Sequence, residues 1–252
     1  MRPVLFHLGP LSVHSYGMVV AIAFVCAWLI LRHELERRAG RGDAAYPLAL
    51  AAAAGGFLGA RVYWFFEHLG HASLTDSFSG AGFTWYGGLL GGAAAMLLVA
   101  RHKRLDLATL LGASAPALAL GYGIGRIACQ LAGDGTYGTR SNLPWAMSYP
   151  HGDVPTTERV HPTPVYETLS SLLIFALLWR WRRRTSAVRL FAAYLVLAGA
   201  ERFLVEFIRR NSHVLLGLTQ PQLFAVAIML VGVALLAAPQ RTGLRASRAT
   251  VG

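Results

Sequence analysis

The stretch LATLLGASAPALALGYGIGRIACQLA, residues 107–132, carries a single charged side chain, Arg126. A run of about 20 mostly apolar residues is long enough to cross the hydrocarbon core of a bilayer as a helix. Pro116 and several glycines interrupt the run, and a broken helix is tolerated in a bilayer where protein or a cavity satisfies its backbone groups. The stretch therefore predicts a membrane-spanning helix, interrupted near Pro116, with a charge inside the bilayer.

The same pattern recurs along the chain. Only 14% of the 252 residues are charged, whereas soluble domains carry about 25%. The fold class is therefore expected to be all-α, a polytopic membrane protein of about seven transmembrane helices. The other spans are predicted at residues 13–31, 45–66, 85–100, 163–181, 190–208 and 223–239.

Basic residues alternate between the two sides of these spans. Of the 23 Lys and Arg residues, 15 fall in the loops 32–44, 101–106 and 180–189 and in the C-terminal tail, against 5 on the other side. Because positively charged loops remain in the cytoplasm, the N-terminus is predicted outside and the C-terminus in the cytoplasm. The net charge of +11 is explained by this bias and by attraction to anionic lipid, and no nucleic-acid partner is expected.

The longest connection between spans, residues 133–162, is predicted to face outward. Loops of this length are usually functional or disordered, and the Trp and Tyr residues of NLPWAMSYP argue against disorder. The loop is therefore expected to lie over the membrane surface beside a site. Residues 1–239 are interpreted as a single transmembrane domain, and residues 240–252 as a basic, disordered cytoplasmic tail.

Three arginines lie inside or at the ends of the predicted spans, where an unpaired charge costs about 2.5–3.5 kcal/mol. Arg126 lies in GYGIGR with no carboxylate at helical spacing except Asp134, so its role is expected to be functional. The flanking glycines would let a phosphate receive both guanidinium and backbone N–H donors. Arg202 shares a helix face with Glu206, and is either half of a structural ion pair or functional. Arg61 has no helical partner and is expected either to bind substrate or to be structural.

Other residues have structural explanations. The glycines of WYGGLLGGAAA are typical of a helix-packing seam. Tyr16, early in the first span, is expected to pack in the core, where its hydroxyl must find a partner. His14 and His161, near span ends, are the histidines that could approach a site. Cys26 and Cys129 lie in apolar surroundings, and no disulfide is predicted.

The segment GRIACQLAGDGTYG, followed by NLPWAMSYP, resembles the signature region of bacterial prolipoprotein diacylglyceryl transferases. The motifs HSYG, GARVYW, YGGLLGG, HPTPVYE and ERFLVEFIRR have counterparts there in the same order, so the resemblance covers most of residues 10–235. It implies a seven-helix enzyme of the bacterial inner membrane that transfers the diacylglyceryl group of phosphatidylglycerol to the lipobox cysteine thiol of a prolipoprotein. This is the first step of lipoprotein maturation, and glycerol phosphate leaves. No metal or organic cofactor is implied, and a monomer is expected.

The resemblance extends to individual residues. Arg126 corresponds to the essential arginine of the signature, and Arg202 and Glu206 to a second functional arginine and the glutamate one turn later. The residues and the resemblance together predict a catalytic set and a substrate-binding set. The catalytic set is Arg126, Arg202, Glu206 and Tyr86; the substrate-binding set is Arg126, Arg61, the first-span tyrosine Tyr16, the acidic residue Asp134 and Gly138.

Three positions depart from the family pattern. Many members have a histidine, proposed as the general base, where this chain has Tyr86. Cys129 replaces an asparagine, and Ala198 replaces a tyrosine. Tyrosine, with a reference pKa near 10, is a poor base. Tyr86 is therefore interpreted as a hydrogen-bond donor or relay, or as a structural aromatic residue, and the general base is left unidentified.

The implied reaction displaces a phosphate ester from a glycerol carbon by sulfur. Arg126 and Arg202 suit it, because guanidinium binds phosphate bidentately and stays charged in a low-dielectric site. The same positive field would lower the pKa of the acceptor thiol, which is about 8.5 when unperturbed. Other classes remain open: a transporter of an anionic solute also uses broken helices and intramembrane arginines, an assembly protein would use packing glycines, and a family paralogue would use a different lipid or acceptor.

Overall fold

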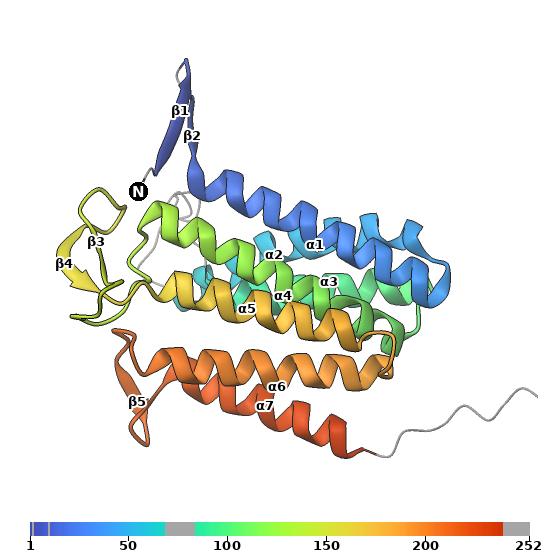
Figure 1. The fold of residues 1–252 in the computed structure, drawn as a ribbon. Coiled ribbons are helices and arrows are strands. Elements are labelled where there is room, and N and C mark those ends of the chain that lie inside the picture. The colour runs from blue at the N-terminus through green and yellow to red at the C-terminus, as the bar shows by residue number, and fades with distance from the viewer. Residues whose placement is uncertain (2, 10, 69–83, 239–252) are drawn as a thin grey trace, which may run out of the picture.

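The computed structural model describes residues 1–238 of the chain except residues 2, 10 and 69–83. In this part of the chain, seven α-helices run alongside one another and three β-hairpins gather at one end of the bundle (Figure 1). The mostly helical fold agrees with the predicted all-α class. The helices are α1 (Ser15–Ala39), α2 (Ala45–Glu67), α3 (Trp85–His102), α4 (Leu107–Ala132), α5 (Thr163–Trp181), α6 (Ala187–Glu206) and α7 (Gln220–Ala237).

The hairpins are short and antiparallel. They pair β1 (Val4–Leu8) with β2 (Leu11–His14), β3 (Met147–Tyr149) with β4 (Thr156–Val160), and β5 (His213–Leu215) with β6 (Leu218–Thr219). A 3-10 turn, η1 (Gly42–Ala44), joins α1 to α2 at the opposite end. All three hairpins therefore follow or precede helix ends on the same side of the bundle.

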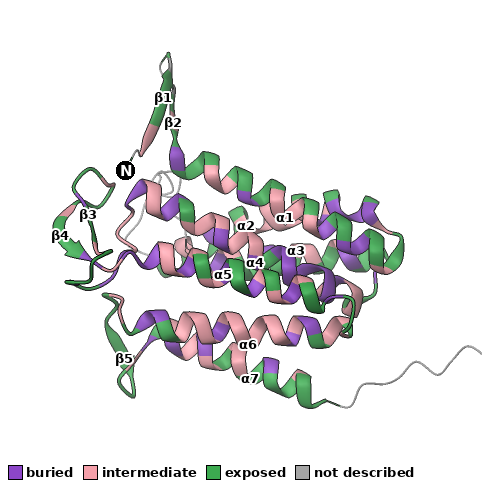
Figure 2. Ribbon diagram, viewed as in Figure 1, coloured by how far each residue is buried: buried purple, intermediate pink, exposed green. Residues whose placement is uncertain are grey.

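Four helical segments among the described residues are long and apolar enough to cross a membrane. They are α1, α2 with its preceding turn, α4 and α7. Many residues along the bundle are exposed (Figure 2). Among the most exposed large apolar side chains are Leu90, Leu98, Leu173 and Leu204, each more than 60% accessible. Such a surface is unfavourable in water, since soluble monomers seldom expose large apolar patches. The fold is therefore that of a membrane protein with several apolar helices.

The helix bounds follow the apolar runs closely, and the differences lie at the helix ends. The first span was expected at 13–31, but Val13 and His14 belong to β2, and α1 continues to Ala39. Helix α1 continues past the point where its side chains become polar. It ends at Gly40, whose φ of 61° suits a glycine C-cap. Helices α6 and α7 each begin three residues earlier than expected, because Ser186 and Thr219 cap their first turns. The expected end at residue 239 lies outside the described residues.

The predicted interruption near Pro116 is wrong. Helix α4 is continuous from Leu107 to Ala132, with Pro116 fully buried inside it. A proline removes one backbone hydrogen bond, and in a bilayer neighbouring helices compensate for the loss. Helix α4 has such neighbours, because it packs against α1, α5 and α6 at the centre of the bundle.

The glycines of the third span form the packing seam that their spacing predicted. A Cβ atom added at Gly87 would collide with the carbonyl oxygen of Gly59, and one at Gly91 with that of Gly55. The α2 and α3 backbones are therefore in direct contact, which only small residues allow.

The connection 133–162 is folded around the β3–β4 hairpin. Tyr137, Tyr149 and Val160 form a small buried cluster, with the two tyrosine rings stacked at 4.8 Å between centroids. The Tyr149 hydroxyl donates to the Gln130 side chain at 2.9 Å, and burial raises the pKa of Tyr149 to about 12. The hairpin is thereby tied to the end of α4, close to Arg126.

Candidate functional site

Glu167 is the centre of a charged cluster near the hairpin end of the bundle. Its side chain, on the second turn of α5, is fully buried. Three arginines from other elements surround the carboxylate: Arg126 of α4 at 3.0 Å, Arg202 of α6 at 3.3 Å, and Arg209, just after α6, at 3.4 Å. The cluster therefore joins α4, α5 and α6 at the same level along the bundle.

Arg126 has more partners than its sequence neighbours suggested. Its Nη2 atom donates to the Tyr122 hydroxyl at 2.8 Å, and that hydroxyl donates to Glu167 at 2.8 Å. Its Nη1 atom lies 3.8 Å from the sulfur of Cys129, which is a free thiol. The Nε atom is buried without a hydrogen-bond partner in the part of the chain that is described. Helical spacing along α4 could not reveal Glu167, because this carboxylate reaches Arg126 from another helix.

Glu206 is the second buried carboxylate of the cluster. The Arg202 Nη2 atom lies 2.7 Å from one of its oxygens, so the i,i+4 spacing does form an ion pair. Arg209 lies 3.8 Å away, and the other carboxylate oxygen accepts from Asn211 at 2.5 Å and from Thr219 at 2.8 Å. Glu206 therefore ties α6 to the start of α7 and holds the Arg202 guanidinium in place.

The ion pairs of the cluster have an excess of positive charge. Glu201 lies within electrostatic range of Arg126 and Glu167, but its carboxylate accepts hydrogen bonds from Ser170 and Ser171. Among the described residues, the ion pairs join the arginines at 126, 202 and 209 to the carboxylates of Glu167 and Glu206. Both carboxylates are fully buried, whereas the arginine side chains are 17%, 21% and 12% exposed, respectively. The acidic side chains are thus more deeply buried than the arginine side chains, which remain partly exposed. This arrangement suits one bound anion, because paired guanidinium groups hold phosphate or carboxylate in a fixed geometry.

Tyr16 is not packed in the core, contrary to expectation. Its side chain is 46% exposed, because it lies on the first turn of α1 just after the β1–β2 hairpin. It lies within electrostatic range of Arg126, Cys129 and Asp134. Its place beside the cluster leaves the hydroxyl open to a ligand, and its role in binding stays a prediction.

Asp134 and Gly138 lie in the loop that follows α4. The Asp134 carboxylate accepts from the backbone and the hydroxyl of Thr136, at 3.2 and 2.6 Å. The Gly138 amide donates to the carbonyl of His161 at 2.8 Å. A Cβ atom at Gly138 would collide with the carbonyl oxygen of Ile208. Gly138 therefore allows the loop to pack between the start of α5 and the end of α6.

Tyr86 and Arg61 lie on the α2–α3 pair. Tyr86 packs edge-on against Phe224 of α7, with 5.9 Å between ring centroids, and is within electrostatic range of Arg202 and Glu206. The Arg61 guanidinium lies 5.6 Å from the ring centroid of Phe57, one turn earlier on α2. Their roles in catalysis and substrate binding stay predictions.

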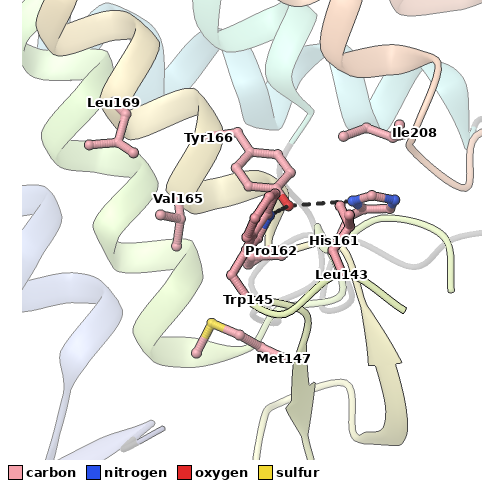
Figure 3. A pocket seen from close by; sticks show the side chains of 9 residues that line it. All are labelled: Leu143, Trp145, Met147, His161, Pro162, Val165, Tyr166, Leu169 and Ile208. Carbon is pink, nitrogen blue, oxygen red and sulfur yellow. Dashed lines mark hydrogen bonds between the residues drawn. The ribbon is translucent and has the colours of Figure 1, made fainter. Parts of the chain in front are cut away.

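An apolar cavity of about 610 Å³ adjoins the cluster. Figure 3 shows Trp145 and His161 directed toward the hydroxyl of Tyr166, at 2.8 and 3.4 Å. Two of the cavity's lining residues are sequence neighbours of the cluster, since Tyr166 precedes Glu167 and Ile208 precedes Arg209. The lining residues are Leu143, Trp145, Met147, His161, Pro162, Val165, Tyr166, Leu169 and Ile208.

Several residues of this site were missed by reasoning from the sequence. Glu167 and Tyr122 each touch Arg126, and Arg209 completes the cluster. A carboxylate in an apolar run is as costly as an arginine, so Glu167 in HPTPVYE carried a usable signal. Glu201 of α6 is another acidic residue inside a helix, and its carboxylate accepts from Ser170 at 2.7 Å.

Comparison with known proteins gives a consistent result. A family model described as prolipoprotein diacylglyceryl transferase matches residues 3–238. A phosphatidylglycerol–prolipoprotein diacylglyceryl transferase of Chromohalobacter salexigens is 37% identical over 249 residues, covering 92% of this chain and 90% of that protein. Proteins of the same name from Methylococcus capsulatus and Clostridium tetani are each 32% identical, over 253 and 216 residues. The former match covers 94% of both chains, and the latter 83% of this chain and 86% of the relative.

Proposed function

Because the chain belongs to the prolipoprotein diacylglyceryl transferase family, we propose that its charged cluster binds phosphatidylglycerol during diacylglyceryl transfer to prolipoproteins. The protein is a transferase of lipoprotein biosynthesis, like the relatives that carry this name. The acceptor is the lipobox cysteine thiol. The observation that carries the proposal is that three guanidinium groups share two ion-paired carboxylates, so that a phosphodiester, with one negative charge, can serve as a further partner.

The leaving phosphate is the group that the cluster serves. In the reaction, sulfur forms a bond to the glyceryl carbon, the carbon–oxygen bond to phosphate breaks, and glycerol phosphate leaves with the electron pair. The thiol proton is lost to the departing phosphate or to water. Arg126 and Arg202 are proposed to bind the phosphate oxygens, where negative charge grows most in the transition state. Their preorganisation by Glu167 and Glu206 supports this role.

The acceptor thiol needs activation, which the same cluster can supply. A thiolate is the nucleophile, and nearby guanidinium groups lower the pKa of a thiol. A dedicated base is therefore unnecessary, which fits the tyrosine at position 86. Tyr86 is proposed to donate a hydrogen bond beside Arg202. Tyr16, Asp134, Gly138 and Arg61 are proposed to line the path of the lipid, and Glu206 to position Arg202.

The proposed membrane topology places this cluster within the helical bundle. All seven helices are proposed to span the bacterial inner membrane, with the N-terminus outside and the C-terminus in the cytoplasm. Helices α5 and α6 carry Glu167, Glu201, Arg202 and Glu206, whose side chains pair or hydrogen-bond with other protein groups. The enzyme is proposed to act as a monomer built on one transmembrane domain, residues 1–239. The predicted tail 240–252 lies outside the described residues.

Complementation tests this function directly. In a strain depleted of its own transferase, the wild-type chain should restore growth, and Arg126→Ala should not, although both accumulate equally in the membrane. Purified wild-type protein should release glycerol phosphate from labelled phosphatidylglycerol only when a lipobox peptide is present. Growth restored equally by Arg126→Ala would contradict the assigned role of Arg126. A folded wild-type protein that consumes no phosphatidylglycerol, or one that imports an anionic solute instead, would contradict the function itself.

A further inference from the structure

A second arginine cluster lies at the end of the bundle opposite the candidate site. Here the C-terminal end of α1 meets the turn between α5 and α6 (Figure 1). Glu34 of α1 is fully buried and pairs with Arg37 at 2.5 Å, Arg38 at 3.2 Å and Arg182 at 3.0 Å. One carboxylate therefore holds three guanidinium groups, and the region keeps a positive excess.

A cavity of about 590 Å³ opens beside this cluster. One wall is a stacked pair, in which the Arg182 guanidinium lies 3.4 Å from the centroid of the Trp179 ring and also donates to the Trp179 carbonyl. Trp179 is in turn packed against His33 and Phe175, each at 5.5 Å between centroids. The residues lining the cavity are Phe175, Ala176, Trp179, Arg180, Arg182 and Arg183.

The cationic side of this cavity lacks compensating charge. Arg180 and Arg183 are exposed, and no acidic side chain in the described ranges pairs with either of them. Burial lowers the pKa of Arg182, and Arg183 and Arg37 lower it further against the opposing effect of Glu34. Positive charge is therefore crowded at this point, and an anion would relieve the repulsion.

The cavity also has a polarity gradient along the helix. Phe175 and Ala176 lie about one turn deeper in α5 than Trp179 and Arg180, and the arginines follow at the helix end. Tryptophans such as Trp179 and Trp181 mark the depth of lipid headgroups. A charged outer end and an apolar inner end match the headgroup and the first acyl carbons of a phospholipid. Basic pockets between transmembrane helices bind anionic headgroups.

We propose that this cavity binds the phosphodiester headgroup of an anionic phospholipid from the leaflet opposite the candidate site. Arg180 and Arg183 contact the phosphate, Arg182 and Trp179 form the fixed wall, and the apolar inner end receives the start of an acyl chain. The site is separate from the transferase cluster, so a lipid bound there takes no part in the reaction.

Native mass spectrometry of the detergent-purified protein with tetraoleoyl cardiolipin tests the proposal. The variant pair is Arg180→Gln with Arg183→Gln, and the matched control is Arg101→Gln with Lys103→Gln, exposed residues in the last turn of α3 and directly after it, at the same end of the bundle. Cardiolipin binding should weaken about thirty-fold in the first pair, since each charge near an anionic headgroup contributes on the order of a five-fold effect. The control pair should bind as the wild type does.

Two further arms separate this site from other sources of binding. Dioleoyl phosphatidylcholine should not replace cardiolipin, and Arg126→Ala should retain the bound lipid, because that substitution disables only the candidate site. Equal losses in both arginine pairs would show a diffuse surface effect and overturn the proposal. Loss of the lipid in Arg126→Ala, or equal thermal stabilisation by millimolar inorganic phosphate alone, would overturn it as well.

Discussion

At the scale of single residues, the candidate site is a balance of charges. Two buried carboxylates hold three partly exposed guanidinium groups. A buried ion pair contributes little net stability, because desolvation offsets most of the attraction. The cluster therefore contributes mainly by holding Arg126, Arg202 and Arg209 in positions that are preorganised for binding a phosphate.

Arg126→Lys and Tyr86→Phe should have very different effects on transfer. Lysine keeps the charge but loses the planar fork that binds two phosphate oxygens, so the rate should fall at least about 100-fold. Tyr86→Phe removes one neutral hydrogen bond and should cost about 10-fold or less. Release of glycerol phosphate from labelled phosphatidylglycerol measures both. Equal losses would mean that the Tyr86 hydroxyl takes part in the chemistry.

Glu167→Gln should lower the stability of the fold as well as the rate of transfer. It leaves three arginines near a single remaining carboxylate, and breaking a buried pair costs about 3–5 kcal/mol. Glu158→Gln is the matched control, since Glu158 pairs with Arg210 at 3.5 Å on the surface, where both side chains are about half exposed; it should cost less than about 1 kcal/mol. Thermal unfolding in detergent compares the two. A smaller shift for Glu167→Gln than for Glu158→Gln would refute the central place of Glu167.

At the scale of elements, helix pairs differ in what holds them together. Helices α4, α5 and α6 meet through charged and hydrogen-bonded side chains, such as Thr168 of α5, which donates to the carbonyl of Gly123 at 3.2 Å. Helices α2 and α3 meet through glycine backbones at 55, 59, 87 and 91. Without a hydrophobic driving force inside the bilayer, close packing of small residues becomes the main attraction between apolar helices.

Gly91→Ala should therefore disrupt the α2–α3 pair, whereas Gly88→Ala should not. A Cβ at Gly91 would lie 2.8 Å from the Gly59 Cα atom, but one at Gly88 would meet its nearest atom, the Gly56 oxygen, at 3.6 Å. Overpacking costs about 1–3 kcal/mol, while alanine in place of an uncrowded helical glycine is neutral or mildly stabilising. Unfolding temperatures in detergent distinguish the two. A seam that tolerates both changes equally would mean that the helices are not held by backbone contact.

At the scale of the whole molecule, the two ends of the bundle differ in chemistry. The hairpins and the candidate site share one end, while the arginine-rich turns and the Glu34 network occupy the other. This asymmetry matches the bias of basic residues between loops and supports an orientation with the candidate site facing outward.

Cysteine labelling of intact cells tests that orientation. Thr157→Cys, exposed on the β3–β4 hairpin, should react with a membrane-impermeant maleimide from outside. Arg101→Cys, at the opposite end of the bundle, should react only after the membrane is permeabilised. The unsubstituted chain, with Cys26 and Cys129, measures the background. The reverse labelling pattern would mean that the protein is inserted the other way round.

The local parts of this molecule could be predicted from the sequence alone. Helices α4 and α5 have the bounds that their apolar runs indicated, because spanning length and backbone hydrogen bonding are properties of one segment. The family followed from ordered motifs, and Arg126 and Arg202 from the cost of charge in an apolar run. The continuity of α4 through Pro116 could not be predicted, since the compensation for a lost hydrogen bond comes from neighbouring helices.

Only the tertiary structure decided which charges meet. The sequence by itself determined that Arg126 and Glu167 lie inside apolar segments, but their 3.0 Å pairing depends on how α4 and α5 are rotated against each other. Membrane helices are apolar on nearly every side, so hydrophobic periodicity does not reveal the face that meets a neighbour. For the same reason, Arg209 and Tyr122 became part of the site only in the folded bundle. The excess positive charge on which the proposed phosphate binding depends is therefore a property of helix packing.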